Sequence, residues 1–206
     1  MPLWGTTATA ATNKPKHLTN DVNSPYDVTT VYADNSGWVQ RPGAGSGNNN
    51  KDAQPEILVA IGGLAGATDT TGLRAPTVTS MRYVVGTTAT TDMTAGASAQ
   101  RILVEVTWDE GITVAGSPQI VIDNGNQSGG GYGDHTLTYI ASGSTANRKR
   151  FIATSRSLGN TDVLTIGGTN LALNSGTISD TVRGGTAQAA SLVLSGLTAI
   201  THTVAA

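Results

Sequence analysis

The sequence predicts an all-β protein whose larger part is an antiparallel sandwich. From residue 77 onward, short runs rich in Val, Ile, Thr and Leu recur at fairly even spacing, separated by Gly, Asn, Asp and Ser. No window keeps the apolar period of a helix. After Pro118 the chain contains no proline, so every later strand keeps its backbone donors. Seven or more short strands punctuated in this way are typical of a sandwich.

The expected strands fall into two groups. In the N-terminal part we expect short strands at 28–33 and 37–40, and a strand buried on both faces within the apolar run EILVAIGGL at 56–64. The later strands are expected at 77–85, 101–108, 118–123, 135–141, 149–155, 162–167, 170–173 and 190–197.

The run at 101–108 shows the alternation of a strand with one face toward the core. Two sets of side chains alternate along it: Ile102, Val104, Val106 and Trp108 on the core face, and Leu103, Glu105 and Thr107 on the other. Burying one such aliphatic side chain contributes about 1.5–3 kcal/mol before entropy is counted. Aromatic residues make up only 4% of the chain, so we expect Trp108 and Phe151 to be core anchors.

The composition excludes several classes of function. Charged residues make up 13% of the chain, and the net charge is −2. The sequence has no stripe of basic residues that could follow the phosphate backbone of a nucleic acid, so we expect no nucleic-acid partner. The one basic cluster, Arg148-Lys149-Arg150, is expected to be a solvated strand edge. The chain has no cysteine, which excludes disulfides and thiolate metal sites.

The domain organisation follows a change in composition. Residues 1–73 hold five of the seven prolines and a Gly/Asn-rich stretch, and they predict an arm with a small β-containing anchoring region. Residues 74–206 predict the sandwich domain. The opening MPLWGTTATAATNKPKHL lacks the pattern of a signal peptide, and no apolar run has the length of a membrane span, so no membrane partner is expected.

Asp109 and Glu110 are the first candidates for chemistry, because two carboxylates stand side by side after Trp108. Neighbouring strand residues face opposite sides, so with Trp108 inward Asp109 should point outward, and the pair should not converge on one substrate. We therefore expect these acids to turn the chain between two strands. Asp109 and Asp180 stay as weak calcium candidates, and no metal site or cofactor is otherwise predicted.

The stretch DNGNQSGGGYGDH at 123–135 predicts a hairpin turn rather than a calcium loop, because the late glutamate of such a loop is missing. Tyr132 is expected at its exposed tip as a surface contact. The histidines His17, His135 and His202 show no zinc-binding spacing, and no serine lies in a nucleophile motif. No catalytic residue is therefore assigned, and the chain is expected to be non-enzymatic.

The N-terminal aromatic residues suggest an anchor. Trp4 and Trp38 lie in a Pro- and Gly-rich part of the sequence with few apolar residues to form a local core. A large apolar residue on such an arm can dock on a neighbouring subunit. Pro2, Leu3, Trp4 and Trp38 are therefore the candidate anchoring residues. The alternative is that both tryptophans pack within the chain's own N-terminal unit.

Residues from about 76 to 197 resemble a bacterial and phage immunoglobulin-like module. The similarity rests on ILVEVTWDEGITVAGSPQIVIDNG, then HTLTYIASG, then DVLTIGGTNLALNSGTISD, of which GSPQIVI and LALNSGTISD are the more specific pieces. Between Tyr139 and Leu164 the chain is short and basic where the family often has an acidic loop. The resemblance implies an immunoglobulin-like β-sandwich of the kind found in surface proteins, adhesins and virion proteins.

The N-terminal sequence is similar to that of structural proteins of contractile-tailed marine cyanophages. The segments that carry this similarity are MPLWGTT, NKPKHL and GWVQRPG. This resemblance implies a non-enzymatic virion protein, most simply a capsid decoration protein held by its N-terminal region. Its location would be the virion, after synthesis in the host cytoplasm without a signal peptide. Its partners would be the major capsid or the neck and tail proteins, in many copies or as a homo-oligomer.

Two alternatives stay open. The chain could instead be a neck, tail or fibre-attachment subunit. It could also be a carbohydrate- or host-surface-binding module, with Tyr132 and Trp38 as the aromatic contacts and a host glycan as the partner.

Overall fold

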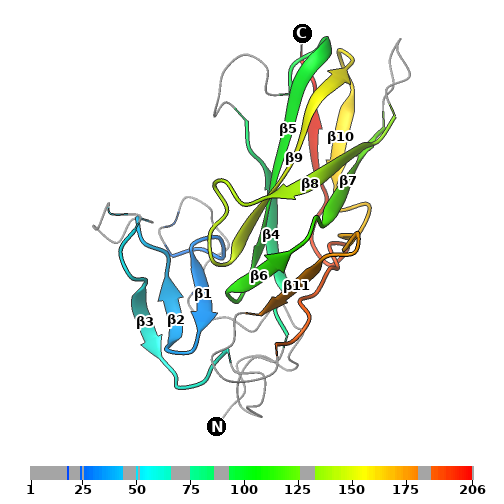
Figure 1. Ribbon diagram of the computed structural model, residues 1–206. Helices are drawn as coiled ribbons and strands as arrows, with labels where there is room; N and C mark the ends of the chain where they lie inside the picture. Colours follow the sequence, from blue (N-terminus) through cyan, green and yellow to red (C-terminus); the bar gives the residue numbers. More distant parts are fainter. Residues whose placement is uncertain are drawn as a thin grey trace. The chain divides into compact units, whose positions relative to one another are not determined.

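The computed structural model describes residues 18, 24, 26–43, 50, 52–65, 75–85, 93–125, 133–180 and 187–205, with the side chains of 97–99 left aside. This part of the chain consists of strands and connections without a helix (Figure 1). The strands form antiparallel sheets in a sandwich-like arrangement. The prediction of an all-β fold is therefore confirmed.

An N-terminal sheet of three strands has the order β1-β2-β3, with bounds β1 Val31–Asp34, β2 Gly37–Gln40 and β3 Glu56–Ala60 (Figure 1). The turn between β1 and β2 is held by Asp34, whose Oδ1 accepts the Ser36 N–H at 2.7 Å. Gly37 follows with φ +130°, and a Cβ there would lie 2.0 Å from the Val59 carbonyl oxygen. Only glycine allows this close approach of β2 to β3.

Strand β3 is an edge strand, and its exposure contradicts the prediction of a strand buried on both faces. Ile57 is 53% exposed, and Val59 is exposed as well. In the register of β2 and β3, Trp38 pairs with Val59 and Val39 pairs with Ile57, so Leu58 is an extra, bulged residue. Such a bulge interrupts the ladder and protects an open edge from further pairing.

The large sheet has seven strands in the order β12-β10-β7-β8-β9-β5-β4. Their bounds are β4 Val78–Tyr83, β5 Gly96–Trp108, β7 Gln119–Asn124, β8 His135–Ile140, β9 Arg148–Leu158, β10 Val163–Ile166 and β12 Ile200–Thr203. A second, two-stranded sheet pairs β6 (Ile112–Ala115) with β11 (Thr177–Asp180).

Strand β5 lies inside the large sheet and is buried on both faces at its C-terminal end. The expected core set is buried, and so are Leu103, Glu105 and Thr107 on the opposite face. Its neighbour β9 contains the basic cluster. Arg148 and Lys149 are buried on an internal strand, so the prediction of a solvated strand edge is wrong.

Large side chains fill the core as their types predict. Trp108 and Phe151 are fully buried, and they are among the largest buried side chains of the described residues. Phe151 pairs across strands with Tyr139, with ring centroids 6.2 Å apart in an edge-on arrangement. The Trp108 Nε1–H donates to the Ser191 carbonyl at 3.1 Å, so its buried polar atom is satisfied.

Two expected strands are not strands. The segments at 170–173 and 190–197 pair with neighbours through separate backbone contacts, such as the bridge between Gln119 and Ala172. Strands β6, β11 and β12 were not expected.

The chain divides into two compact units that are discontinuous in sequence. One unit comprises Met1–Ser80, Thr107–Val114 and Thr177–Ser191, and the other comprises Met81–Val106, Ala115–Gly176 and Leu192–Ala206. Both units are assembled from separate segments of the chain. The predicted domain boundary between residues 73 and 74 stays a prediction.

Candidate functional site

The connection between β5 and β6 carries the most unusual chemistry of the described residues. It consists of Asp109, Glu110 and Gly111, so the two acids do turn the chain between strands. Both side chains are nevertheless buried, which contradicts the expectation that Asp109 points outward. We call Asp109, Glu110 and Asp180 the acidic cluster, because both aspartates act electrostatically on Glu110.

Asp109 is held by Thr77, which lies just before β4. The Thr77 N–H donates to Oδ1 at 2.7 Å, and the Thr77 hydroxyl donates to Oδ2 at 2.6 Å. In return, the Asp109 N–H donates to the Thr77 carbonyl at 3.0 Å. Burial raises the pKa of Asp109 to about 7, although the hydrogen bonds from Thr77 favour the charged form.

Glu110 has no such support. Its side chain is 0% exposed, and neither carboxylate oxygen has a hydrogen-bond partner. Burial raises its pKa to about 9, and the like charges of Asp109 and Asp180 add to that rise. Glu110 is therefore a neutral acid at pH 7.

Asp180 completes the cluster from the end of β11. Its Oδ1 accepts the Gln188 N–H at 2.7 Å, and its own N–H donates to the Gln188 carbonyl at 3.0 Å. Burial raises the pKa of Asp180 above its usual value. Burial thus raises the pKa of each of the three carboxyl groups and favours its protonated form.

The N-terminal sheet attaches to this same connection through Ala33 of β1. The Ala33 N–H donates to the Asp109 carbonyl at 2.6 Å, and the Gly111 N–H donates to the Ala33 carbonyl at 3.2 Å. Together they form a parallel bridge between Ala33 and Glu110. Glu110 therefore lies between the two hydrogen bonds that join β1 to the connection.

The arrangement gives no support to the weak calcium candidates Asp109 and Asp180. Each already accepts hydrogen bonds from its own chain, from Thr77 and Gln188. Within the described ranges no group of three or more His, Cys, Asp or Glu residues could hold a metal ion. What the acidic cluster can do chemically is take up and release protons.

A second buried glutamate has the opposite environment. Glu105 of β5 is 0% exposed and binds arginines from both neighbouring strands. Its Oε2 lies 2.7 Å from Arg82 Nη2 and 3.4 Å from Arg148 Nε, and its Oε1 lies 2.8 Å from Arg150 Nε. Burial works to raise the pKa of Glu105, but Arg148, Arg150 and Arg82 outweigh it and hold the pKa below its usual range.

Lys149, between Arg148 and Arg150 in the sequence, has a different partner. Its Nζ donates to the Thr145 carbonyl at 2.7 Å, and burial lowers its pKa to about 8. The basic cluster therefore has an internal structural role.

The stretch at 123–135 joins two antiparallel neighbours, β7 and β8, as a hairpin requires. Asn124 Nδ2 donates to Asp162 Oδ2 at 2.9 Å, and the Asn124 N–H donates to Asp134 Oδ1 at 3.0 Å. The bond to Asp134 closes the base of the hairpin, and the bond to Asp162 ties it to the residue before β10. Burial lowers the pKa of the adjacent His135, and Arg156 adds to that effect. Tyr132, the expected surface contact, lies outside the described residues.

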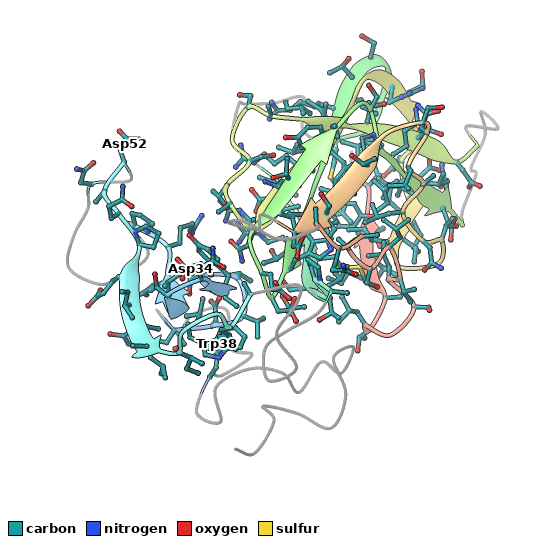
Figure 2. The ribbon with its side chains drawn as sticks, turned by 60° about the horizontal axis from the view of Figure 1, so that its bottom comes forward. Asp34, Trp38 and Asp52 are labelled. Carbon is teal, nitrogen blue, oxygen red and sulfur yellow. The ribbon has the colours of Figure 1, made fainter. Side chains whose placement is uncertain are left out.

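Trp38, an expected anchoring residue, packs inside its own unit. Figure 2 labels it on the N-terminal sheet. It is buried on β2 against Val31, Ala33, Leu64 and Ala65. This is the alternative that the sequence left open, and it removes Trp38 from the candidates for docking on a neighbour or binding a glycan. Pro2, Leu3 and Trp4 lie outside the described residues.

Sequence reasoning missed the acidic cluster as a set. Thr77 is distant from Asp109 along the chain and stands in no motif, and Asp180 was paired with Asp109 only as a weak calcium candidate. The bridge to Ala33 gives no local sequence signal either. The signals were Asp109-Glu110 directly after an apolar strand and Asp180 at the end of GTISD.

Among the residues that the structure describes, no helix has the length and hydropathy to cross a membrane. Comparisons of the chain with protein-family models, with curated proteins and with solved structures give no match.

Proposed function

We propose that the chain is a non-enzymatic structural protein of a phage virion, in the form of a capsid decoration protein. Its N-terminal region would anchor it to the particle, and an immunoglobulin-like sandwich would carry the outer surface. Its partners would be the major capsid protein or the neck and tail proteins, and many copies would be displayed together. Multiple copies on one particle make individually weak contacts sufficient for assembly.

The observation that carries the proposal is the place of the resembling segments in the fold. ILVEVTW, PQIVID, HTLTYI and DVLTIG contribute β5, β7, β8 and β10, which all belong to the seven-stranded sheet. The resembling segments around β6 and β11 form the separate two-stranded sheet, so the resemblance spans both sheets of the proposed sandwich. Inside the seven-stranded sheet, Glu105 binds Arg82 and Arg150 of the two neighbouring strands, which suits a rigid building block.

The distribution of aromatic side chains favours a structural role over glycan binding. A carbohydrate-binding surface needs exposed aromatic rings, and Trp38, Trp108 and Phe151 are buried. In the described part of the chain, Tyr26 is the exposed aromatic residue, at 46%. The anchoring role falls to Pro2, Leu3 and Trp4.

Cosedimentation with particles that lack this component tests the proposal. The full chain and a chain starting at residue 21 are mixed with stripped particles and compared. We expect the full chain to bind and the shortened chain to remain in solution, with Trp4→Ala weakening binding in the same direction. Equal binding of both chains would assign the interface to residues 21–206 and remove the anchoring role from Pro2, Leu3 and Trp4. Binding of neither, together with retention on a glycan array, would overturn the proposal in favour of a host-surface module.

A further inference from the structure

The acidic cluster is placed where it can control a junction. Glu110 is enclosed, and both of its oxygens lack partners. The charged groups that act on it within the described residues are Asp109 and Asp180, and both are acids. Ala33 forms one hydrogen bond on each side of it.

We propose that Asp109, Glu110 and Asp180 form a proton-controlled latch, which holds β1 of the N-terminal sheet on the connection at residues 109–111. While Glu110 carries its proton, the connection stays closed and the bonds of Ala33 persist. When Glu110 loses its proton, a bare carboxylate would remain in a site without a cation, beside two other acids. The charge can reach water only if the connection opens, which breaks the bonds to Ala33.

The direction of the pH dependence follows from proton linkage. The closed state holds the Glu110 proton up to about pH 9, while an open connection releases it near the ordinary value of 4.5. Between these values opening releases a proton, so the equilibrium constant for opening rises about tenfold per pH unit. Asp109 adds to this slope below pH 7, where its closed form is still protonated. Above pH 7 the slope therefore belongs to Glu110.

The latch does not depend on the proposed virion function, because it uses only contacts within one compact unit. It gives the N-terminal sheet two states, one docked on the connection and one released in alkaline solution. A particle-binding failure would leave it untouched, and its own failure would leave the virion proposal intact.

Hydrogen exchange of the full chain at pH 7.0 and 8.5 tests the latch. The readouts are the Ala33 and Gly111 amides, after division by their intrinsic exchange rates. For the wild type we expect the opening constant to rise about thirtyfold between the two pH values. Glu110→Gln keeps the shape of the protonated acid and cannot ionise, so its opening constant should stay flat.

Two further variants sharpen the test. Glu56→Gln removes an exposed carboxylate of β3 in the same unit and should leave the thirtyfold rise unchanged. Asp180→Asn removes one like charge, lowers the pKa of Glu110, and should give a smaller rise at pH 8.5 than the wild type shows. This second variant keeps the latch testable if Glu110→Gln does not fold.

Three results would overturn the latch. The first is an equal pH slope in the wild type and in Glu110→Gln. The second is a carbon NMR titration in which the Glu110 carboxyl loses its proton near 4.5. The third is a rise that millimolar calcium abolishes in the wild type at constant pH, because the acidic cluster would then respond to a cation.

Discussion

Glu105 in β5 and Glu110 in the connection after β5 are both buried, but their neighbours shift their pKa values in opposite directions. Glu105 has three arginines within reach, so its negative charge is stabilised and its pKa lies below the usual range. Glu110, five residues later, has two acids for neighbours and no hydrogen bond, and its pKa rises to about 9. The residue type is the same, and the strands packed around each side chain decide its charge.

Replacing Glu105 should destabilise the protein strongly. Glu105→Gln leaves three guanidinium groups facing a neutral amide, and breaking a buried ion pair in this way costs about 3–5 kcal/mol. Urea denaturation at pH 7 measures the loss, with the exposed Glu56→Gln as control.

The pH dependence of that loss has a definite sign. The lowered pKa of Glu105 means that its stabilising contribution is present above the ordinary pKa of 4.5 and disappears as the pH falls through the folded value. The gap between wild type and variant should therefore close in acid. A gap that persists unchanged at pH 2 would contradict the ion-pair explanation.

Thr77 should matter through its hydroxyl. Thr77→Val keeps the shape but removes the 2.6 Å bond to Asp109 Oδ2, which leaves a buried acceptor unsatisfied. We expect a loss of about 1–3 kcal/mol in unfolding free energy and a further rise in the pKa of Asp109. Thr77→Ser, which keeps the hydroxyl, should recover most of the loss. Equal stability of the Val and Ser variants by thermal denaturation would count against this bond.

At the scale of elements, the local sequence pattern predicted where strands occur better than it predicted which position each strand takes in a sheet. The alternation in β7 was sufficient to locate it, and its buried set of Ile120, Ile122 and Asn124 follows the period of two. The apolar run that became β3 was expected inside a sheet, but a short apolar run does not show whether a second neighbour pairs with it. For Arg148 and Lys149 the error was the opposite: they were expected at a solvated edge and are buried inside the sheet. The local pattern could not show this, because the partner of Arg148 is Glu105, more than forty residues away.

The exposed edge strand predicts a contrast between two isoleucines. Ile57→Lys on β3 should change the unfolding free energy by no more than about 0.5 kcal/mol, because the side chain is already half in water. Ile120→Lys on β7 places an ammonium group at a fully buried position and should cost more than about 4 kcal/mol. Urea midpoints of the two variants measure the difference, and similar midpoints would contradict the assignment of β3 as an edge.

For the whole molecule, the raised carboxyl pKa values set the pH of greatest stability. Asp109 and Glu110 hold protons in the folded state that the unfolded chain releases near pH 4. Their contribution to stability is therefore complete below about pH 4 and is lost as the pH rises through 7 and then 9. Lys149, with its pKa lowered to about 8, opposes this loss only at pH values above 8.

The unfolding free energy should consequently fall between pH 5 and pH 8. Each buried carboxyl contributes a slope of about 1.4 kcal/mol per pH unit over the range in which only the folded state is protonated. Urea denaturation followed by tryptophan fluorescence at pH 5, 6.5 and 8 measures the slope. Asp109→Asn combined with Glu110→Gln should flatten it, and a wild-type curve that rises over this range would show that the acids are ionised in the fold.

The discontinuous make-up of the first compact unit has a consequence for synthesis. The segment Met1–Ser80 belongs with Thr107–Val114 and Thr177–Ser191, which leave the ribosome much later. At ordinary elongation rates the roughly 100 residues between Ser80 and Thr177 take about 5 to 20 s to translate. During that interval the later segments of this unit are not yet available to pack against the nascent N-terminal sheet. A message cut short before residue 177 would yield a chain that cannot complete this unit.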